Sequence, residues 1–423
     1  MGKGLILSAP NSGAGKTTIT LGVLHALARR GVDVRGAKSG PDYIDPRFHE
    51  AACGTTCPNL DAWAMSPDRL RTLAASDGLL VIEGAMGLFD GAPPDGKGAT
   101  ADLARQLNLP VVLIIDAAKT AQSVAPLVAG FARHDKDVQI NGVILNNVGS
   151  ARHEAMLIRA LAPIGLPVLG AIYRQTGLEH PSRHLGLVQA GEHPDMAAYL
   201  TSVADAVEAA LDLEALINLA APLPESATGK FTPPPAQNIA IAQDQAFAFA
   251  YPHLLEDWRA AGANLQFFSP LADDPAPKAD LVFLPGGYPE LHAAKLSAAS
   301  IFRASMLAAA DRGTQIYGEC GGYMSLGSGL TDASGTHHKM LGLLQLQTSF
   351  AKRKLHLGYR SVTASAGPFA GHFAAHEFHY ASTIAAKGPA LFAAKDAEGN
   401  SLGGFGLIMG NICGSFIHLI EKQ

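Results

Sequence analysis

The chain has 423 residues, of which 48% are hydrophobic and 16% are charged, and its formal net charge is −5. This length exceeds one ordinary core and predicts two domains, and the high apolar content excludes a disordered chain. A slightly acidic balance without blocks of like charge argues against a nucleic-acid-binding protein, which needs a basic face.

Cysteine usage and apolar runs indicate the compartment. Four cysteines in a chain of this length do not make a disulfide framework. The longest apolar runs, such as Val111–Ile115, have the length of a strand rather than of a membrane span, and we expect no signal peptide before the first strand. We therefore expect a reduced, cytoplasmic protein that does not enter a membrane.

The first half of the chain alternates apolar strands with helical stretches. The predicted helices include Thr17–Arg30, Thr100–Leu107 and Glu154–Leu161. Continuous apolar strands that alternate with helices indicate an α/β fold with a parallel sheet covered on both faces. The predicted strands are Leu5–Ser8, Val34–Ala37, Leu79–Ile82, Val111–Ile115, Gly142–Leu145 and Val168–Ile172.

A glycine-rich loop follows the first predicted strand and precedes a helix, which is the context of a Walker A phosphate loop. Its glycines let the backbone wrap phosphate oxygens, Lys16 would neutralise the phosphates of ATP, and Thr17 would hold Mg²⁺. Pro10 stands where the usual first glycine would be, and the alternative is a glycine turn without a ligand. The predicted nucleotide-binding residues of the loop are Gly13, Gly15, Lys16, Thr17 and Thr18.

Two carboxylates follow the third predicted strand. Glu83 comes directly after Leu79–Ile82, and Asp90 lies on the next turn. Carboxylate oxygens are ligands that Mg²⁺ prefers, and a strand end beside a phosphate loop is where such a metal is needed. Glu83 and Asp90 are therefore candidate metal ligands together with Thr17, the alternative being a cap or a surface residue.

Polar side chains also end two other strands. Lys38 opens a polar segment, residues 38–49, at the carboxyl edge of the sheet, where it would bridge phosphate and an acyl oxygen as charge develops. The alternative is a solvated turn. Asn146 and Asn147 end the fifth strand and either read the base of the nucleotide or are ordinary turn residues.

Prolines mark a domain boundary. Pro222, Pro224 and the run Pro233–Pro235 interrupt the pattern, and such runs behave as semi-rigid spacers. We expect a synthetase domain at 1–222, a linker at 223–237 and a second domain at 238–423. The alternation of strands and helices then resumes, and residues 341–382 are rich in β structure. The strands predicted there are Ile239–Ala242, Leu265–Phe268, Leu281–Leu284 and Ile316–Tyr317.

The last of these strands leads into a nucleophile elbow. The sequence Gly-Glu-Cys-Gly-Gly (318–322) joins strand to helix, and small residues must flank a nucleophile on so strained a turn. The helix N-terminus predicts a lowered pKa for the Cys320 thiol. The N–H of Gly321 and that of Gly287, in another glycine turn, would form an oxyanion hole. The alternative is a buried, inert cysteine.

A nucleophilic thiol needs a base, and spacing alone does not choose one. The candidates in this half include His337, His338, His356, His372, His376, His379 and His418.

Together these motifs resemble those of cobyrinic (or hydrogenobyrinic) acid a,c-diamide synthases. The N-terminal half also resembles dethiobiotin synthetase, and the C-terminal half is similar to class I, triad-type glutamine amidotransferases in the variant shared with cobyric acid synthases. The resemblance covers essentially the whole chain and rests on the phosphate loop, Lys38–His49, Val81–Gly91, Leu284–Glu290, Tyr317–Gly322 and His376–Tyr380.

The resemblance implies a two-step chemistry. Glutamine would be hydrolysed through a thioester on Cys320, with His418 as the residue that raises the nucleophilicity of the thiol. The ammonia would amidate the a- and c-acetate carboxylates of a corrin, hydrogenobyrinic or cobyrinic acid, after ATP has activated them as acyl phosphates.

The resemblance also assigns residues in the synthetase half. Asp45, Glu83 and Asp90 match positions tied to Mg²⁺ and to handling of the intermediate, so Asp45 joins Lys38 as a predicted catalytic residue. Tyr43 and Ile44 match positions that touch the substrate side chain.

One departure concerns the triad. The family of triad amidotransferases commonly carries Glu two residues after the histidine, where this chain has Ile420. Glu421 would point to the other face of a strand. We therefore expect His418 to act without a third orienting carboxylate.

Two other kinds of protein share some of these motifs. The N-terminal half also resembles partitioning ATPases, but these carry a second Lys early in the phosphate loop, which Ala9–Ser12 lacks, and have no use for Cys320. Within enzymes, the alternative is a relative that amidates another tetrapyrrole, such as a cobyric acid synthase or a nickel-tetrapyrrole diamide synthase. The sequence leaves the roles of His376 and His379, and formation of a homodimer, open.

Overall fold

The computed structural model describes residues 2–175, 182–183, 186–187, 189–192, 195–226 and 231–423. The chain divides into two compact units, Met1–Lys230 and Phe231–Gln423, and this division falls within residues 223–237.

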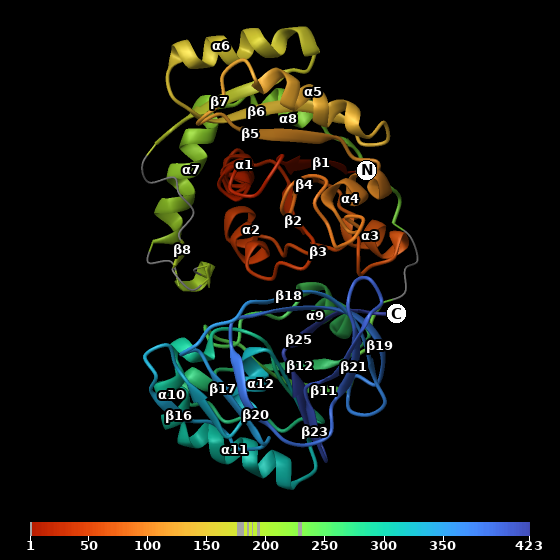
Figure 1. The fold of residues 1–423 in the computed structure, drawn as a ribbon, viewed down its shortest axis with the longest axis vertical. Helices are drawn as coiled ribbons and strands as arrows, with labels where there is room; N and C mark the ends of the chain where they lie inside the picture. Colours follow the sequence, from red (N-terminus) through yellow and green to blue (C-terminus); the bar gives the residue numbers. More distant parts are fainter. Residues whose placement is uncertain (1, 176–181, 184–185, 188, 193–194, 227–230) are drawn as a thin grey trace. The chain divides into compact units, whose positions relative to one another are not determined.

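The first unit is built on a parallel sheet. The strand order is β3-β2-β4-β1-β5-β6-β7, with neighbouring pairs parallel, and β10 pairs antiparallel to β1. Figure 1 shows β5, β6 and β7 side by side in the orange-to-yellow part of the chain. The strands are β1 Lys3–Ser8, β2 Val34–Ser39, β3 Asn59–Leu60, β4 Leu79–Glu83, β5 Val111–Asp116, β6 Ile140–Val148, β7 Val168–Tyr173, β8 Ser182–Arg183, β9 Gly186–Leu187 and β10 Ala221–Pro222.

Helices pack on this sheet and on one another, with α1 against α7 and α2. Side-chain caps start several of them: the Ser66 hydroxyl accepts from the N–H of Arg69, and the Ser150 hydroxyl from that of His153. The helices are α1 Lys16–Arg29, α2 Asp45–Cys53, α3 Pro67–Ala74, α4 Thr100–Leu107, α5 Val124–His134, α6 Ala151–Leu161, α7 Met196–Ala210 and α8 Leu213–Leu219, with 3₁₀ turns at Ala162–Ile164 and Ala190–Glu192.

The predicted α/β fold is confirmed, and the predicted strands lie within β1, β2, β4, β5, β6 and β7. Their buried faces explain the apolar runs, since residues such as Leu5, Ile6 and Leu7 are fully buried. The carboxyl ends of parallel strands meet at one edge, so the loops after β1, β2, β4 and β6 converge there.

The second unit has a central sheet of order β12-β11-β13-β14-β24-β23, parallel except for β23. Two further sheets, β16-β15-β17-β20 and β22-β21-β18-β19-β25, account for the β-rich region. The strands are β11 Asn238–Ala242, β12 Asn264–Phe268, β13 Leu281–Leu284, β14 Gln315–Glu319, β15 Gly329–Thr331, β16 His337–Lys339, β17 Leu346–Ser349, β18 His356–Ala364, β19 Gly371–His379, β20 Ser382–Ala386, β21 Phe392–Lys395, β22 Ser401–Phe405, β23 Leu407–Met409, β24 Ile412–Ser415 and β25 Ile417–Lys422.

Helices and apolar side chains complete the second unit. A core of side chains from β11, β13, β14, α11 and α12 includes Phe302 and Met306, and Phe247, in the loop after β11, joins it. All three are nearly inaccessible to solvent. The helices are α9 Pro252–Ala260, α10 Ala293–Ala298, α11 Ser300–Asp311 and α12 Gly321–Leu326, with 3₁₀ turns at Pro270–Ala272 and Pro289–Leu291.

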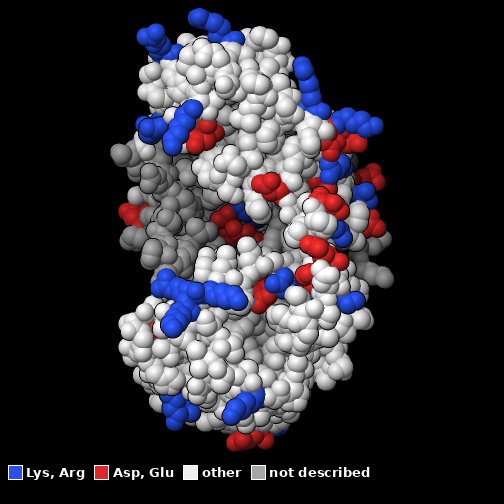
Figure 2. Space-filling view, viewed as in Figure 1, with Lys and Arg blue, Asp and Glu red and all other residues white. Residues whose placement is uncertain are grey.

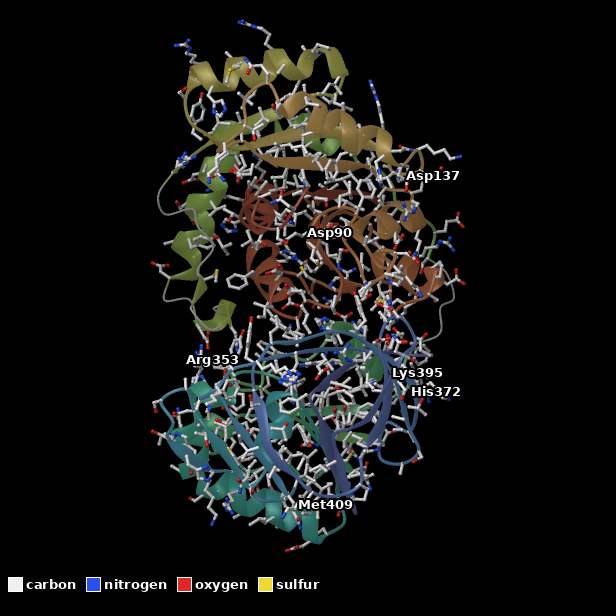
Figure 3. The ribbon with its side chains drawn as sticks, in the orientation of Figure 1. Asp90, Asp137, Arg353, His372, Lys395 and Met409 are labelled. Carbon is white, nitrogen blue, oxygen red and sulfur yellow. The ribbon has the colours of Figure 1, made fainter. Side chains whose placement is uncertain are left out.

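Charged side chains of both signs are interspersed with a large uncharged area on the face shown in Figure 2. Arg353, labelled in Figure 3, belongs to a run of three exposed cations, residues 352–354, before β18. Within the part of the chain that the structure describes, every helix is too short or too polar to cross a bilayer.

Candidate active sites

The phosphate loop of the first unit joins β1 to α1 as the sequence predicts. Gly15 caps α1 with φ of 88°, a left-handed conformation that favours glycine. The Lys16 Nζ donates to the carbonyl oxygen of Asn11 at 3.2 Å. From the end of β6, Asn146 Nδ2 donates to the carbonyl oxygen of Ala14 at 2.9 Å. Asn146 therefore braces the loop, a contact that neither interpretation of its sequence position included.

Beside this loop, a buried ammonium lies between two buried carboxylates. Lys38 Nζ, at the end of β2, is 2.5 Å from Asp45 Oδ2 and 2.8 Å from Glu83 Oε1. Thr17 Oγ1 donates to the same Glu83 oxygen at 2.6 Å. The structure thus brings together four residues that the sequence singled out from three separate segments, and the solvated-turn alternative for Lys38 does not hold.

The charges of this cluster stabilise one another. Burial alone would lower the pKa of Lys38, but the carboxylates of Asp45 and Glu83 outweigh it and raise the pKa well above its usual range. For Glu83, burial would raise the pKa, yet Lys38 and His49 outweigh it and hold the pKa well below its usual range. Both groups are therefore charged at neutral pH.

His49, on α2, is a member of this cluster to which sequence reasoning assigned no role. Its Nε2 lies 2.7 Å from Glu83 Oε2, and the side chain is fully buried. Asp42 holds the start of α2, since its Oδ1 accepts from the N–H groups of Ile44 and Asp45 at 2.8 and 3.1 Å. The only signal for His49 in the sequence was the high density of polar residues in 38–49, and this density does not show which of them form the cluster.

The cluster opens onto a cavity of about 880 Å³, a size that suits a small-molecule ligand. The phosphate loop lines one part of the cavity, and Asn147, Arg174 and α7 line others. The predicted nucleotide-binding residues that line it are Gly13, Gly15, Lys16, Thr17, Thr18 and Asn146.

The remaining predicted residues of this unit lie nearby. Asp90, labelled in Figure 3, is exposed, and its Oδ2 accepts from the N–H of Gly87 at 2.9 Å. Its charge also acts on Lys16, whose pKa is lowered by burial despite the attraction of Glu83, Asp45 and Asp90. Tyr43 and Ile44 are buried, each with 5% of its surface exposed.

The donor set at the cluster fits Mg²⁺. Thr17 Oγ1 and the Glu83 carboxylate are hydrogen-bonded, and the Asp45 carboxylate lies across Lys38 from them. Hydroxyl and carboxylate oxygens beside a phosphate loop are the hard ligands this ion prefers.

In the second unit, Cys320 lies on a strained elbow between β14 and α12. Its φ of 46° and ψ of −101° place a non-glycine residue in an unfavourable region, as a nucleophile elbow requires. The N–H of Cys320 donates to the carbonyl oxygen of Ser415 at 2.8 Å, which fixes the elbow to the end of β24.

The expected lowering of the Cys320 pKa is wrong. Burial, reinforced by the nearby carboxylate of Glu290, raises the pKa of the thiol well above its usual range, and the N–H of Gly321 offsets this only in part. α12 spans only residues 321–326, so its dipole is small, whereas the thiol is 4% exposed. The resting group is therefore a neutral thiol that needs a base.

His418 lies close to the elbow on β25 and is fully buried. Burial lowers its pKa to about 3, with further lowering by His376 and His379, so the imidazole is neutral and able to accept a proton. A Cβ on Gly286 would lie 2.3 Å from the His418 ring, so only glycine leaves room for it.

The two predicted oxyanion-hole glycines are neighbours. A Cβ on Gly321 would lie 2.9 Å from the nitrogen of Gly287, so the two backbones approach as closely as glycine allows. The N–H of Gly322 donates to the carbonyl oxygen of Pro285 at 3.0 Å and ties the two turns together.

A buried carboxylate, Glu319, lies beside His418, where the sequence predicted none. Its Oε2 is 3.8 Å from Nδ1 of His418. Burial raises the pKa of Glu319 to about 8. The expectation of an unassisted histidine rested on residues 420 and 421, whereas Glu421 instead accepts from the hydroxyl of Thr232 at 2.7 Å.

The histidines of β19 also surround the site. His376 is the register partner of His418, and the His379 ring stacks between those of His356 and Phe416, with centroid distances of 4.5 and 3.9 Å. His379 Nε2 lies 3.1 Å from Glu377 Oε1, and Arg360 pairs with the other Glu377 oxygen at 2.8 Å. His356, Glu377 and His379 each offer one possible metal-ligand atom, and these atoms lie within 4.8 Å of one another.

Known protein families match both units. The CobB/CobQ-like glutamine amidotransferase domain family matches residues 238–423, and the CobQ/CobB/MinD/ParA nucleotide binding domain family matches residues 5–188. Proteins named hydrogenobyrinate a,c-diamide synthase from Brucella anthropi and Rhizobium meliloti are 54% identical to this chain, over 99% of it and over 98% and 99% of their own lengths. The protein of that name from Mesorhizobium japonicum is 49% identical, over 99% of both chains. The chain therefore belongs to the hydrogenobyrinate a,c-diamide synthase family.

Proposed function

We propose that this chain converts hydrogenobyrinic acid to its a,c-diamide, using ATP to activate each acetate carboxylate and glutamine as the source of ammonia. The name shared by relatives at 54% identity over nearly the full length supports the choice of substrate. The joint presence of a phosphate-loop site and a cysteine elbow supports the choice of reaction, since neither site explains the other.

In the first unit, a substrate carboxylate oxygen attacks the γ-phosphorus of ATP, giving an acyl phosphate and ADP. Ammonia then attacks the carbonyl carbon, phosphate leaves, and the nitrogen loses a proton. Lys16 and Lys38 bind the phosphate oxygens whose charge grows during transfer. Thr17, Glu83, Asp45 and Asp90 would hold Mg²⁺, which would neutralise nucleotide phosphates when bound.

In the second unit, His418 takes the proton of the Cys320 thiol, and the sulfur attacks the amide carbon of glutamine. The backbone N–H groups of Gly287 and Gly321 stabilise the oxyanion, and ammonia leaves with the proton from His418. Water then hydrolyses the thioester to glutamate. The raised pKa of Cys320 and the lowered pKa of His418 fit this division of roles.

The alternative substrates are cobyrinic acid and other tetrapyrrole carboxylates. The experiment that separates them offers hydrogenobyrinic acid and cobyrinic acid separately, with Mg²⁺-ATP and glutamine, and follows the products by mass spectrometry. Two exchanges of hydroxyl for amide on hydrogenobyrinic acid are expected. If the enzyme hydrolyses glutamine and ATP but does not amidate hydrogenobyrinic acid, the proposed substrate is wrong, whereas the proposed amidotransferase chemistry still stands.

A further inference from the structure

We propose that Glu319, the residue directly before the nucleophile, is the positioning residue that orients His418 in the glutaminase reaction. The inference rests on the proposed glutaminase role of Cys320 and His418, and it supplies the third group that the sequence did not reveal.

Glu319 contacts the histidine strand in two ways. Its Oε1 accepts from the N–H of Leu419, the residue after His418, at 3.2 Å, and from the hydroxyl of Tyr317 at 3.2 Å. Its Oε2 is 3.8 Å from His418 Nδ1, within ion-pair distance although longer than a hydrogen bond. One carboxyl group therefore accepts from the backbone of the histidine segment and lies within ion-pair distance of its ring, and both side chains are almost fully buried.

The proposed proton transfer from the Cys320 thiol requires a hydrogen-bond acceptor beside Nδ1 of the His418 ring. For the far nitrogen, Nε2, to accept the proton of the thiol, the neutral imidazole must carry its own proton on Nδ1. A carboxylate oxygen facing Nδ1 favours that tautomer and stabilises the imidazolium that forms after transfer. Glu319 is placed to do both in its ionised form, whose share grows as the pH rises toward the pKa of about 8. Its second oxygen is already fixed by Leu419.

Other charged groups face the same histidine or the thiol. His376 and His379 on β19 disfavour a positive charge on His418. Glu290 and Glu377 disfavour a negative charge on Cys320. An imidazolium at position 418 would therefore form beside two histidines, and the carboxylate at 3.8 Å is the group placed to offset them.

The test compares Glu319→Gln with Glu319→Asp. The amide keeps the size of the side chain and its acceptor for Leu419, but it presents an N–H₂ donor to Nδ1 and so favours the wrong tautomer. In serine proteases the equivalent exchange lowers kcat by about 10⁴; the longer contact here predicts a loss of roughly 100-fold in glutaminase kcat with little change in KM for glutamine. Glu319→Asp keeps the charge and should retain more activity than Glu319→Gln.

A second readout follows the thiol itself. The rate at which iodoacetamide alkylates the Cys320 peptide, measured by mass spectrometry across pH, reports proton transfer to His418. In Glu319→Gln this reaction should shift to higher pH. Glu421→Gln, which alters another buried carboxylate near His418 in sequence, is the matched control and should leave both measurements unchanged.

The two proposals fail in different ways. Glutamate release needs no corrin, so an error in the corrin substrate leaves this test intact. An unfolding transition at the wild-type midpoint, followed by the fluorescence of the buried Trp258 of the second unit with Trp63 replaced by Phe, would show that Glu319→Gln is folded. A Glu319→Gln enzyme with wild-type kcat and an unshifted alkylation profile would overturn the positioning role. A loss greater in Glu319→Asp than in Glu319→Gln would also overturn it, because packing rather than charge would then matter.

Discussion

Lys38 and His418 show two ways in which burial sets the charge of single residues. Lys38 stays charged because Asp45 and Glu83 lie within 2.8 Å of its ammonium. His418 stays neutral because burial and neighbouring histidines disfavour its charged form. The first keeps a charged ammonium beside the phosphate loop, and the second leaves an imidazole that can accept a proton.

Replacing Lys38 with Met would leave two buried carboxylates without their shared cation. Removing one partner of a buried ion pair costs about 3–5 kcal/mol. We expect Lys38→Met to lower the unfolding temperature and to abolish ammonium-dependent amidation, while glutamine hydrolysis continues. Lys136→Met, on an exposed loop before β6, is the control and should change neither. Amidation at the wild-type rate in Lys38→Met would contradict this role.

The titration of His418 predicts a pH dependence of stability. Its pKa falls from 6.5 to about 3 on folding, so between these values the unfolded chain binds a proton that the folded chain does not. Stability present above pH 6.5 is therefore lost as the pH falls toward 3. When the pH falls from about 7.5 to about 5, the titration of His418 lowers the free energy of unfolding by about 2 kcal/mol.

The asparagine of His418→Asn cannot titrate. As the pH falls over this range, the free energy of unfolding of this variant should therefore decrease by about 2 kcal/mol less than that of the parent protein. Chemical unfolding followed by the fluorescence of Trp258, with Trp63 replaced by Phe, reports the second unit. An equal loss in both proteins would show that His418 is not the group responsible.

At the scale of elements, turns that follow strands of the sheets place the reacting groups. In the second unit, the turn after β13 approaches the elbow after β14. Gly321 leaves room for the backbone of Gly287, and Gly286 leaves room for the ring of His418. In the first unit, Asp42 accepts from the N–H groups of Ile44 and Asp45 where α2 begins, and α2 brings His49 to the strand end at Glu83.

Gly286→Ala tests the first of these arrangements. The added methyl would lie 2.3 Å from the His418 ring, so the ring must move. We expect glutaminase kcat to fall by roughly 10- to 100-fold, since displacements of about 1 Å cost that much, with ammonium-dependent amidation unchanged. Gly130→Ala, where nothing lies within 4 Å of the added methyl, is the control and should leave both activities intact. A fully active Gly286→Ala would indicate that the ring does not need this space.

At the scale of the whole molecule, two units divide the chemistry. The nucleotide-binding family matches residues 5–188 and the glutamine amidotransferase family residues 238–423. We propose that each reaction has its own core and sheet edge.

Paired variants test this division. Lys16→Ala should abolish amidation from either nitrogen source but leave some glutamine hydrolysis. Cys320→Ala should abolish the use of glutamine yet amidate at high ammonium concentration, because the synthetase site is unchanged. Cys413→Ala serves as the control for loss of a buried cysteine. Steady-state assays of glutamate and amide formation measure both, and failure of ammonium to rescue Cys320→Ala would argue against separate sites.

The sequence by itself determined the α/β fold, the phosphate loop and the nucleophile elbow, because each depends on local rules. Apolar periodicity sets strands and helices, and glycines permit turns that other residues cannot adopt. The sequence also marked Lys38, Glu83 and Cys320, since each stands at the end of a predicted strand.

Only the tertiary structure decided which distant groups meet. His49 reaches Glu83 across 34 positions, Asn146 reaches Ala14 across 132, and Glu319 binds the N–H of Leu419 across 100. No local pattern encodes such separations. The pKa of Cys320 was mispredicted for the same reason: the sequence showed the helix N-terminus, whereas burial by distant segments raises the pKa. Burial and long-range contact are properties of the packed chain, and they set the charge and orientation of the reacting groups.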